Sequence, residues 1–404
     1  MSVESEFGRR VPDRRRFLKQ AALSLVCACW LGVFLSVWVR VDGYQWDFKT
    51  YFYASRALDR GLNPYQVPAL AQVAGEGSHP LRFVYPLTAL YLMRPLAQLD
   101  YATAHRIWLL IKAGAIIGLI SLWKRVFLRD VDWLWILVVG LFAFQAATIW
   151  DIKAGNVSTL EQLLLWSGFA CLVRGRPVAF AGLVVAAALF KLTLAAFLIL
   201  LLVSPNRGRR GTFLFASAFL LLAVVTAGSF AGHPGYFRDF VRAASSTPAW
   251  LESNPSAFGV AVELARRYPA VFGVSAAIPY ALWLLFSGGV LILGRRLIVR
   301  ALRSQAQFAV LVACFCYALV APRMMIYSYM ILIVPVLGLL LPSVKSRSMG
   351  VYAVAALLCL DGLRVLPADI GRLAQDCQPL ILLLASWFFL VYADARNLLR
   401  EPAL

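Results

Sequence analysis

The chain has 404 residues, of which 61% are hydrophobic and only 15% are charged, and its mean hydropathy is +0.75. A soluble domain is about half apolar and about a quarter charged, and it lacks the apolar runs of about 20 residues that recur here. The composition therefore excludes a soluble protein and predicts an all-α polytopic membrane protein. A β-barrel would instead show alternating segments of about 10 residues, and the sequence has none.

The chain carries 39 Lys and Arg against 20 Asp and Glu, a net charge of +19. Most of the basic residues form short clusters between apolar runs, the positive-inside pattern of membrane proteins, so we expect contacts with membrane lipids and no nucleic acid. The clusters are Arg14 to Lys19, Lys124 to Arg129, Arg174 and Arg176, Arg207 to Arg210, Arg295 to Arg303, and Lys345 with Arg347. Neither the cysteines nor the isolated histidines form a metal-binding pattern.

Apolar segments divide the chain into a cytoplasmic basic tail (1–18), a single transmembrane domain (19–394) and a second cytoplasmic tail (395–404). The first segment is long enough for a retained signal anchor. The candidate spans are 19–40, 83–98, 104–123, 133–150, 157–173, 177–203, 212–231, 270–293, 305–320, 326–341, 349–366 and 379–394.

Two of these spans are ambiguous. The segment 83–98 is short and holds two prolines, so it either crosses the membrane or only enters it. The segment 177–203 is either one tilted helix or a hairpin broken around Lys191. Only a non-crossing 83–98 combined with a hairpin at 177–203 places every basic loop on the inside. Both solutions leave the loops 41–82 and 232–269 outside and give 11 to 13 transmembrane or re-entrant helices.

The first outside loop carries the most polar stretch of the chain, Trp46 to Tyr53. Its spacing predicts a short interfacial amphipathic helix over 47–58, ended by Gly61 and the following Asn-Pro turn. Asp47 is either the N-cap of this helix or a catalytic base oriented by Lys49 and nearby tyrosines. Asp42 is a rival carboxylate, and a second short helix is expected over 256–267 in the later outside loop.

Further polar residues occur at the ends of spans. Tyr85 opens the 83–98 segment, either to stack on a sugar or as part of an aromatic belt. Asn156 lies in the polar turn 151–158, where it either contacts substrate or caps a helix. Glu161 follows one turn later, and we expect it to pair with Lys153.

Two cations stand out against the apolar background. Lys191 lies within a span, where a charge costs about 2.5–3.5 kcal/mol; it either binds an anionic phosphate or snorkels to the surface. Arg323 follows the helix-breaking Pro322 and departs from the inside bias of the other arginines. Its guanidinium suits a phosphate, and the alternative is a loop anchor beside interfacial tyrosines such as Tyr327.

These motifs, in this order, resemble the GT-C superfamily of membrane glycosyltransferases and in particular glycosyltransferase family 87. That family includes polyprenyl-phosphate-mannose-dependent α-mannosyltransferases. The resemblance rests on Asp47 to Tyr51, the Gly-x-Asn-Pro-Tyr turn at Gly61 to Tyr65, Phe83 to Pro86, Gly155-Asn156, Lys191, and Pro322-Arg323 before Tyr327. The chain departs from the family where Ala154-Gly155-Asn156-Val157 replaces a Gly-Gln-x-Asn motif and where Leu192 replaces a proline. It also lacks the histidine that some members place near Arg323.

The resemblance implies a GT-C-like helical bundle that moves a hexose, by default mannose, from a polyprenyl-phosphate donor to a glycolipid or polysaccharide. It implies an inverting displacement with Asp47 as general base and with Arg323 and Lys191 on the donor phosphate. The residues expected to contact substrate are Lys49, Tyr51, Asn63, Tyr65, Tyr85, Asn156 and Tyr327. No metal or cofactor is implied, and the site would face outward from a bacterial inner membrane.

Two other functions stay open. A transporter or flippase for lipids or lipid-linked sugars also places charges within its spans. A non-catalytic scaffold of an envelope-synthesis complex would make Asp47 dispensable.

Overall fold

The structure is a computed structural model. It describes residues 14–41, 43–75, 81–203, 208–245, 254–269, 277–304, 306–343 and 376–395. All regular structure in these residues is helical, which confirms the predicted all-α class. The predicted span 349–366 and the rival carboxylate Asp42 lie outside the described residues.

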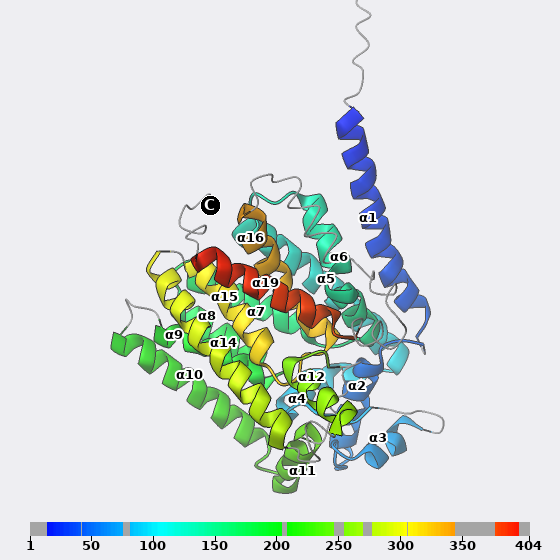
Figure 1. Cartoon of the computed structure of the whole chain (residues 1–404). Helices are drawn as coiled ribbons and strands as arrows, with labels where there is room; N and C mark the ends of the chain where they lie inside the picture. The colour runs from blue at the N-terminus through cyan, green and yellow to red at the C-terminus, as the bar shows by residue number, and fades with distance from the viewer. Residues whose placement is uncertain are drawn as a thin grey trace, which may run out of the picture.

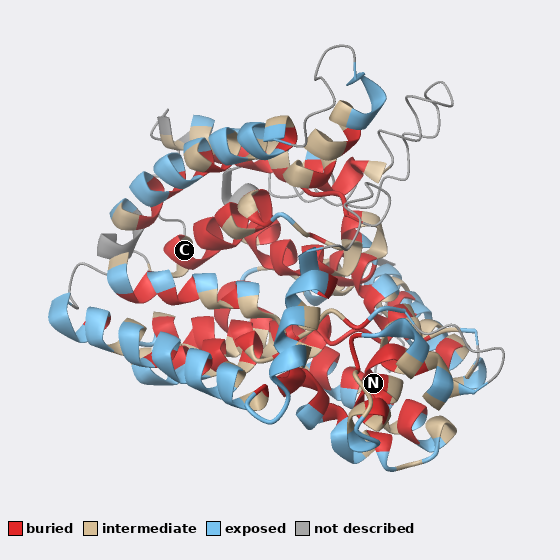
Figure 2. Ribbon diagram, turned by 90° about the horizontal axis from the view of Figure 1, so that it is seen from below, coloured by how far each residue is buried: buried red, intermediate tan, exposed pale blue. Residues whose placement is uncertain are grey.

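Five helices are long and apolar enough to cross a membrane, which confirms a polytopic membrane protein. They are α1 (Arg14–Val39), α5 (Tyr101–Leu122, continued by the π-helical turn η1, Trp123–Phe127), α6 (Trp133–Ala154), α10 (Gly208–Ser229) and α14 (Ala277–Ser304). Their outer faces carry exposed apolar side chains, such as Phe213 at 70% and Leu285 at 76%. Figure 2 shows such exposed outer faces around a buried interior, the pattern expected of a bundle surrounded by lipid.

A second group of apolar helices is shorter. It comprises α7 (Ser158–Val173), α8 (Pro177–Ala188), η2 (Leu192–Ile199) with α9 (Leu200–Val203), α15 (Ala306–Val320), η3 (Ile326–Leu332) with α16 (Ile333–Ser343), and α19 (Gln378–Ala395). At 1.5 Å per residue, α7 extends about 24 Å, less than the roughly 30 Å of a bilayer core. Most of these short segments begin or end at breaks in the chain that meet at one place in the bundle.

The segment 177–203 forms the hairpin that the charge pattern favoured. The ring of Phe169 on α7 contacts Phe180 of α8 and also Phe197 of η2, at centroid distances of 6.3 and 5.1 Å. Lys191 between the two arms has an extended backbone, with φ −139° and ψ 99°. The chain therefore reaches Lys191 and then turns back alongside the same helix.

The segment 83–98 does not cross the bundle. Its helix α4 (Leu87–Ala97) has only 11 residues and packs along α2 (Trp46–Asp59). The Ser55 hydroxyl donates to the carbonyl of Leu90 at 3.1 Å, and Arg56 donates to the carbonyl of Ala97 at 2.9 Å. Because both ends of α4 lie against α2, the chain enters and leaves this segment on the same side.

Short helices gather at one end of the bundle, the pocket end, where the site described below lies. They are α2, α3 (Val67–Ala74), α4, α11 (Pro234–Ser245) and α12 (Ala257–Arg267), and Figure 1 shows them together at the lower end. The predicted helices over 47–58 and 256–267 are thus confirmed. Aromatic and aliphatic side chains of α2, α4 and α5, among them Phe48 and Trp108, form a hydrophobic cluster of their own.

The basic clusters gather at the opposite end. Lys19 of α1 forms an ion pair with Asp132 before α6, and the Gln307 amide donates to the Phe127 carbonyl at 3.1 Å. These contacts bring together the start of α1, the turn after α5 and the turn between α14 and α15. The basic residues near these turns and at the α7–α8 turn are Lys19, Lys124, Arg125, Arg129, Arg174, Arg176, Arg295, Arg296 and Arg300. One end of the bundle is therefore strongly basic, as the positive-inside rule predicts.

Candidate active site

A cavity of about 260 Å³ lies where three breaks in the chain meet. The breaks are residues 84–86 before α4, 189–191 at the tip of the α8–η2 hairpin, and 321–325 between α15 and η3, with the first residues of η2 and η3 directly after them. The first turns of α7 and the end of α11 complete the lining, which consists of Val84, Tyr85, Pro86, Ser158, Glu161, Phe190, Lys191, Leu192, Thr193, Phe240, Ala244, Pro322, Arg323, Met325 and Tyr327. Non-helical backbone within a membrane bundle is tolerated where it lines a cavity of this kind.

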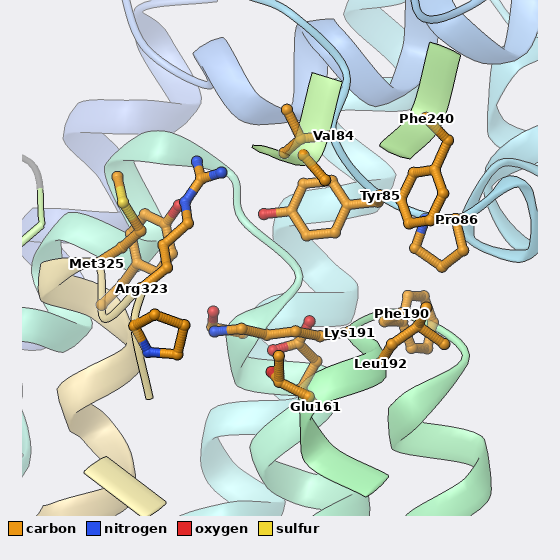
Figure 3. Close-up of a pocket in the computed structure, with 15 residues that line it drawn as sticks. Val84, Tyr85, Pro86, Glu161, Phe190, Lys191, Leu192, Phe240, Arg323 and Met325 are labelled. Carbon is orange, nitrogen blue, oxygen red and sulfur yellow. The ribbon is translucent and has the colours of Figure 1, made fainter. Parts of the chain in front are cut away.

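The two predicted phosphate-binding cations, Lys191 and Arg323, both line this cavity although they come from different breaks. The Lys191 ammonium donates to the Ser328 hydroxyl at 3.1 Å. Figure 3 shows that the side chains of Lys191 and Tyr85 both extend toward the side of the cavity that carries Arg323. The cavity therefore has two positive groups and a phenol hydroxyl near one another.

Asp47 lies directly behind this lining, in the first turn of α2. The N-cap of α2 is Gln45, with φ 66° and no side-chain capping bond, so the N-cap interpretation of Asp47 is wrong. Its carboxylate instead accepts hydrogen bonds from the Asn156 amide, at 2.8 Å, and from Tyr327. Since Tyr327 also lines the cavity, Asp47 is separated from it by one layer of hydrogen-bonded side chains.

The pKa of Asp47 is raised from its ordinary value of 3.8 to about 6. Burial is the main cause, because it disfavours the charged form, and the hydrogen bond from Asn156 opposes it. The nearby Asp151 raises the pKa further, while Lys112 lowers it. A carboxylate with a pKa near 6 is mostly ionised at neutral pH and is a better proton acceptor than an ordinary aspartate.

The side chain of Asn156 connects Asp47 to two tyrosines. Its amide nitrogen lies 2.8 Å from the Asp47 carboxylate, 2.9 Å from the Tyr51 hydroxyl and 3.0 Å from the Tyr85 hydroxyl. Its amide oxygen accepts from the backbone and the hydroxyl of Ser158, which fixes the orientation of the amide. Asn156, Tyr51, Tyr85 and Tyr327 thus lie together around Asp47. Their contact with substrate stays a prediction.

Sequence comparison identifies the family of this chain. A profile described as Glycosyltransferase family 87 matches residues 83–328, well over half of the 404 residues. The chain belongs to glycosyltransferase family 87. The match includes Tyr85, Asn156, Lys191 and Arg323 but begins after Asp47. No curated protein and no solved structure matches the chain.

In this family 87 glycosyltransferase a buried ion pair supports the Asn156 turn, and sequence reasoning missed it. The Lys112 ammonium of α5 lies 2.5 Å from the Asp151 carboxylate, and both side chains are fully buried. Lys112 also donates to the Asn156 carbonyl at 2.5 Å, and the Thr159 hydroxyl donates to Asp151. The rule that singled out Lys191, a charge inside an apolar span, would have identified Lys112 as well.

The expected pairing of Glu161 with Lys153 is wrong. Lys153 lies over the rings of Tyr44 and Trp150, at 5.7 and 5.8 Å from their centroids. Glu161 instead lines the cavity near Lys191, whose charge acts on it. The glycosyltransferase therefore has a carboxylate in its cavity for which the sequence pattern predicted a pair with Lys153.

The tyrosines of the site remain neutral at physiological pH. Burial raises the pKa of Tyr85 to about 12, with the charge of Asp47 as a further cause. Burial also raises the pKa of Tyr51 well above its ordinary value. Both hydroxyls therefore keep their protons and can donate hydrogen bonds to a carboxylate or to substrate oxygens.

Five of the seven residues predicted to contact substrate are not part of the cavity lining. Tyr51 and Asn156 belong to the layer behind it, and the other three contact other parts of the protein. Asn63 donates to Asp239 of α11 at 2.7 Å, and the Tyr65 hydroxyl donates to the Tyr85 carbonyl at 2.9 Å. The Lys49 side chain extends over the ring of Tyr101, with its nitrogen 5.6 Å from the centroid. In the structure the Asn-Pro-Tyr turn holds α11 and the 84–86 segment in place around the cavity.

Proposed function

We propose that this membrane glycosyltransferase transfers a hexose, by default mannose, from a polyprenyl-phosphate donor to a hydroxyl of a glycolipid or polysaccharide. The observation that carries the proposal is that Lys191 and Arg323 line one cavity while a carboxylate with a raised pKa, Asp47, lies one layer behind it. Two cations suit the single phosphate of such a donor, and the carboxylate suits an acceptor hydroxyl.

The size of the cavity supports a headgroup rather than a whole lipid. Its volume of about 260 Å³ is below the roughly 300–1,000 Å³ of sites that enclose drug-sized ligands. A sugar phosphate occupies such a space, and the polyprenyl chain then extends over the apolar outer faces of the bundle. This arrangement matches a donor that enters sideways from the membrane.

In the proposed reaction the acceptor hydroxyl attacks the anomeric carbon of the donor sugar. The hydroxyl proton passes to Asp47 by way of the Tyr327 hydroxyl, which lines the cavity and donates to the Asp47 carboxylate. The new glycosidic C–O bond forms, and the bond between the anomeric carbon and the phosphate oxygen breaks. Arg323 and Lys191 stabilise the negative charge that develops on the departing polyprenyl phosphate. A single displacement of this kind inverts the anomeric centre.

The distribution of charge supports a membrane orientation. By the positive-inside rule we expect the basic end of the bundle on the cytoplasmic side, and we therefore propose that the cavity faces the extracytoplasmic side of a bacterial inner membrane. A lipid-linked donor is available on that face, whereas nucleotide sugars stay in the cytosol. The proposal therefore requires no nucleotide-binding domain.

The decisive experiment incubates purified protein in lipid vesicles with a polyprenyl-phosphate sugar labelled in the sugar, together with candidate acceptors. Label that moves to an acceptor supports a transferase, whereas label that only crosses the bilayer identifies a transporter instead. Asp47→Asn should abolish transfer. The matched control is Asp59→Asn at the other end of α2, where the carboxylate forms a surface pair with Arg94 at 2.8 Å; this variant should transfer normally.

A further inference from the structure

The carboxylate of Glu161 lacks the partner that a buried charge normally has. Glu161 is 2% exposed, and its Oε1 atom has no hydrogen-bond partner in the structure. Buried polar groups are almost always hydrogen-bonded, so an unpartnered carboxylate oxygen beside a cavity indicates a ligand that supplies the donor. Asp151 also has one carboxylate oxygen without a partner, but its other oxygen binds Lys112 and the residue does not line the cavity, whereas Glu161 lines the cavity and has no ion pair among the described residues.

The position of Glu161 near Lys191 and Arg323 limits which part of a ligand can donate to its carboxylate. Lys191 is near enough for its charge to act on Glu161, yet its ammonium donates to Ser328 instead. A phosphate placed against Glu161 would be repelled, so the phosphate belongs between Lys191 and Arg323. Of the groups that a sugar-phosphate donor carries, the sugar hydroxyls are the ones that can donate a hydrogen bond to Glu161 without charge repulsion.

We propose that Glu161 forms the sugar subsite of this cavity and accepts a hydrogen bond from a ring hydroxyl of the transferred sugar. The inference rests on the proposed lipid-phosphate donor and identifies which residue recognises its sugar. In Figure 3 the Glu161 carboxyl lies next to the Lys191 side chain, on the side away from Tyr85. A sugar attached to a phosphate held by Lys191 and Arg323 therefore lies close to Glu161.

A binding experiment separates sugar recognition from phosphate recognition. It compares two lipids, polyprenyl phosphate and the same lipid carrying the sugar, bound to wild type, Glu161→Ala and Lys191→Met in detergent. Glu161→Ala should weaken binding of the sugar-bearing lipid about 10- to 100-fold, the range for a hydrogen bond to a charged group. It should leave binding of the bare phosphate lipid unchanged or tighter, because a negative charge is removed. Lys191→Met should weaken both.

A panel of donors that each lack one hydroxyl then identifies the contact. For one deoxy donor, wild type and Glu161→Ala should bind equally, because the hydrogen bond is already missing. For the remaining donors the 10- to 100-fold difference should persist. Glu161→Gln keeps the shape of the side chain and one acceptor oxygen, so it should retain part of the preference for the sugar-bearing lipid over the bare phosphate lipid. It replaces the alanine variant in this experiment if the alanine variant does not fold.

Three results would overturn the inference. One is an equal loss of affinity for both lipids in Glu161→Ala, which would mean that Glu161 maintains the shape of the cavity and does not recognise the sugar. The second is a constant Glu161→Ala effect across all the deoxy donors. The third is a failure of wild type to bind either lipid, which would overturn the proposed donor as well. Normal binding without sugar transfer would refute the transferase proposal alone, since the sugar subsite is measured by affinity.

Discussion

Replacing Asp47 by asparagine should remove activity and at the same time stabilise the protein. The substitution keeps the size of the side chain and an oxygen that can accept from Asn156, now 2.8 Å from the carboxylate. It removes the ability to take a proton, for which general base catalysis typically contributes about 10²–10⁴-fold. It also removes a negative charge from a site that disfavours it.

The size of the stabilisation follows from the pKa. The folded protein raises the pKa of Asp47 from 3.8 to about 6, and each unit of pKa difference corresponds to about 1.36 kcal/mol. Keeping Asp47 ionised therefore costs the folded state about 3 kcal/mol above pH 6. The folded state binds the proton more tightly than the unfolded chain, so this cost decreases as the pH falls from about 6 and disappears below about 4.

The assay is thermal unfolding of wild type and Asp47→Asn in detergent at a series of pH values, followed by tryptophan fluorescence. The variant should melt above wild type at pH 7 to 8, and the two melting temperatures should converge toward pH 4. The difference between the melting temperatures of the two proteins is used because ionisable groups that both proteins share affect both melting temperatures alike. Asp59→Asn, on the same helix but at the surface, is the matched control for the substitution.

Two outcomes would refute the reasoning. A variant that is less stable than wild type at pH 7 would mean that the Asp47 charge is well compensated, and the argument for an unusually basic carboxylate would fail. A stability difference that does not change with pH would show that the effect comes from packing rather than from ionisation. Full sugar transfer by a stable Asp47→Asn protein would remove this residue from the mechanism.

The other predictions concern the groups around the carboxylate. Arg323→Ala should raise the KM for the lipid-phosphate donor more than that for the acceptor, and equal changes would contradict its assignment to the phosphate. Asn156→Ala removes a hydrogen bond that lowers the pKa of Asp47, so the acid limb of the pH–rate profile, near pH 6 in wild type, should move to higher pH. Lys112→Met should lower the free energy of unfolding by about 3–5 kcal/mol, because it leaves the buried Asp151 without its counter-charge. Adding Asp151→Leu to this variant should recover much of the loss. Thermal unfolding of the single and the double variant checks both expectations.

Sequence alone predicted the fold class because apolar runs and basic loops follow directly from the membrane environment. The charge pattern also favoured the correct one of two topologies, since only a hairpin at 177–203 collected the basic loops on one side. Sequence could not decide between them by hydropathy, because an apolar helix of 27 residues and a hairpin of two short arms have the same composition. The contacts of Phe169 with both arms decide it.

The candidate site was predicted only in part, for a different reason. Lys191, Arg323 and Asp47 are conspicuous because they are charged residues at unusual places in an apolar chain. Asn63 and Lys49 are polar residues of an outside loop, and sequence does not show whether such a side chain points into a cavity or toward another helix. The predicted partner of Glu161 was wrong because a carboxylate near the start of a helix usually pairs with a nearby basic residue.

The pattern of paired and unpaired charges suggests how the polar residues of the site divide their work. Lys112 and Asp151 are fully buried and bind each other, so their charges cancel and they hold the Asn156 turn in place. Among the described residues, no ion pair joins Lys191 or Arg323 to a carboxylate, and both line the cavity. Buried charges that pair with each other therefore hold the backbone around the site in position. Charges without a partner in the protein lower its stability, and they are expected where a charged substrate compensates them.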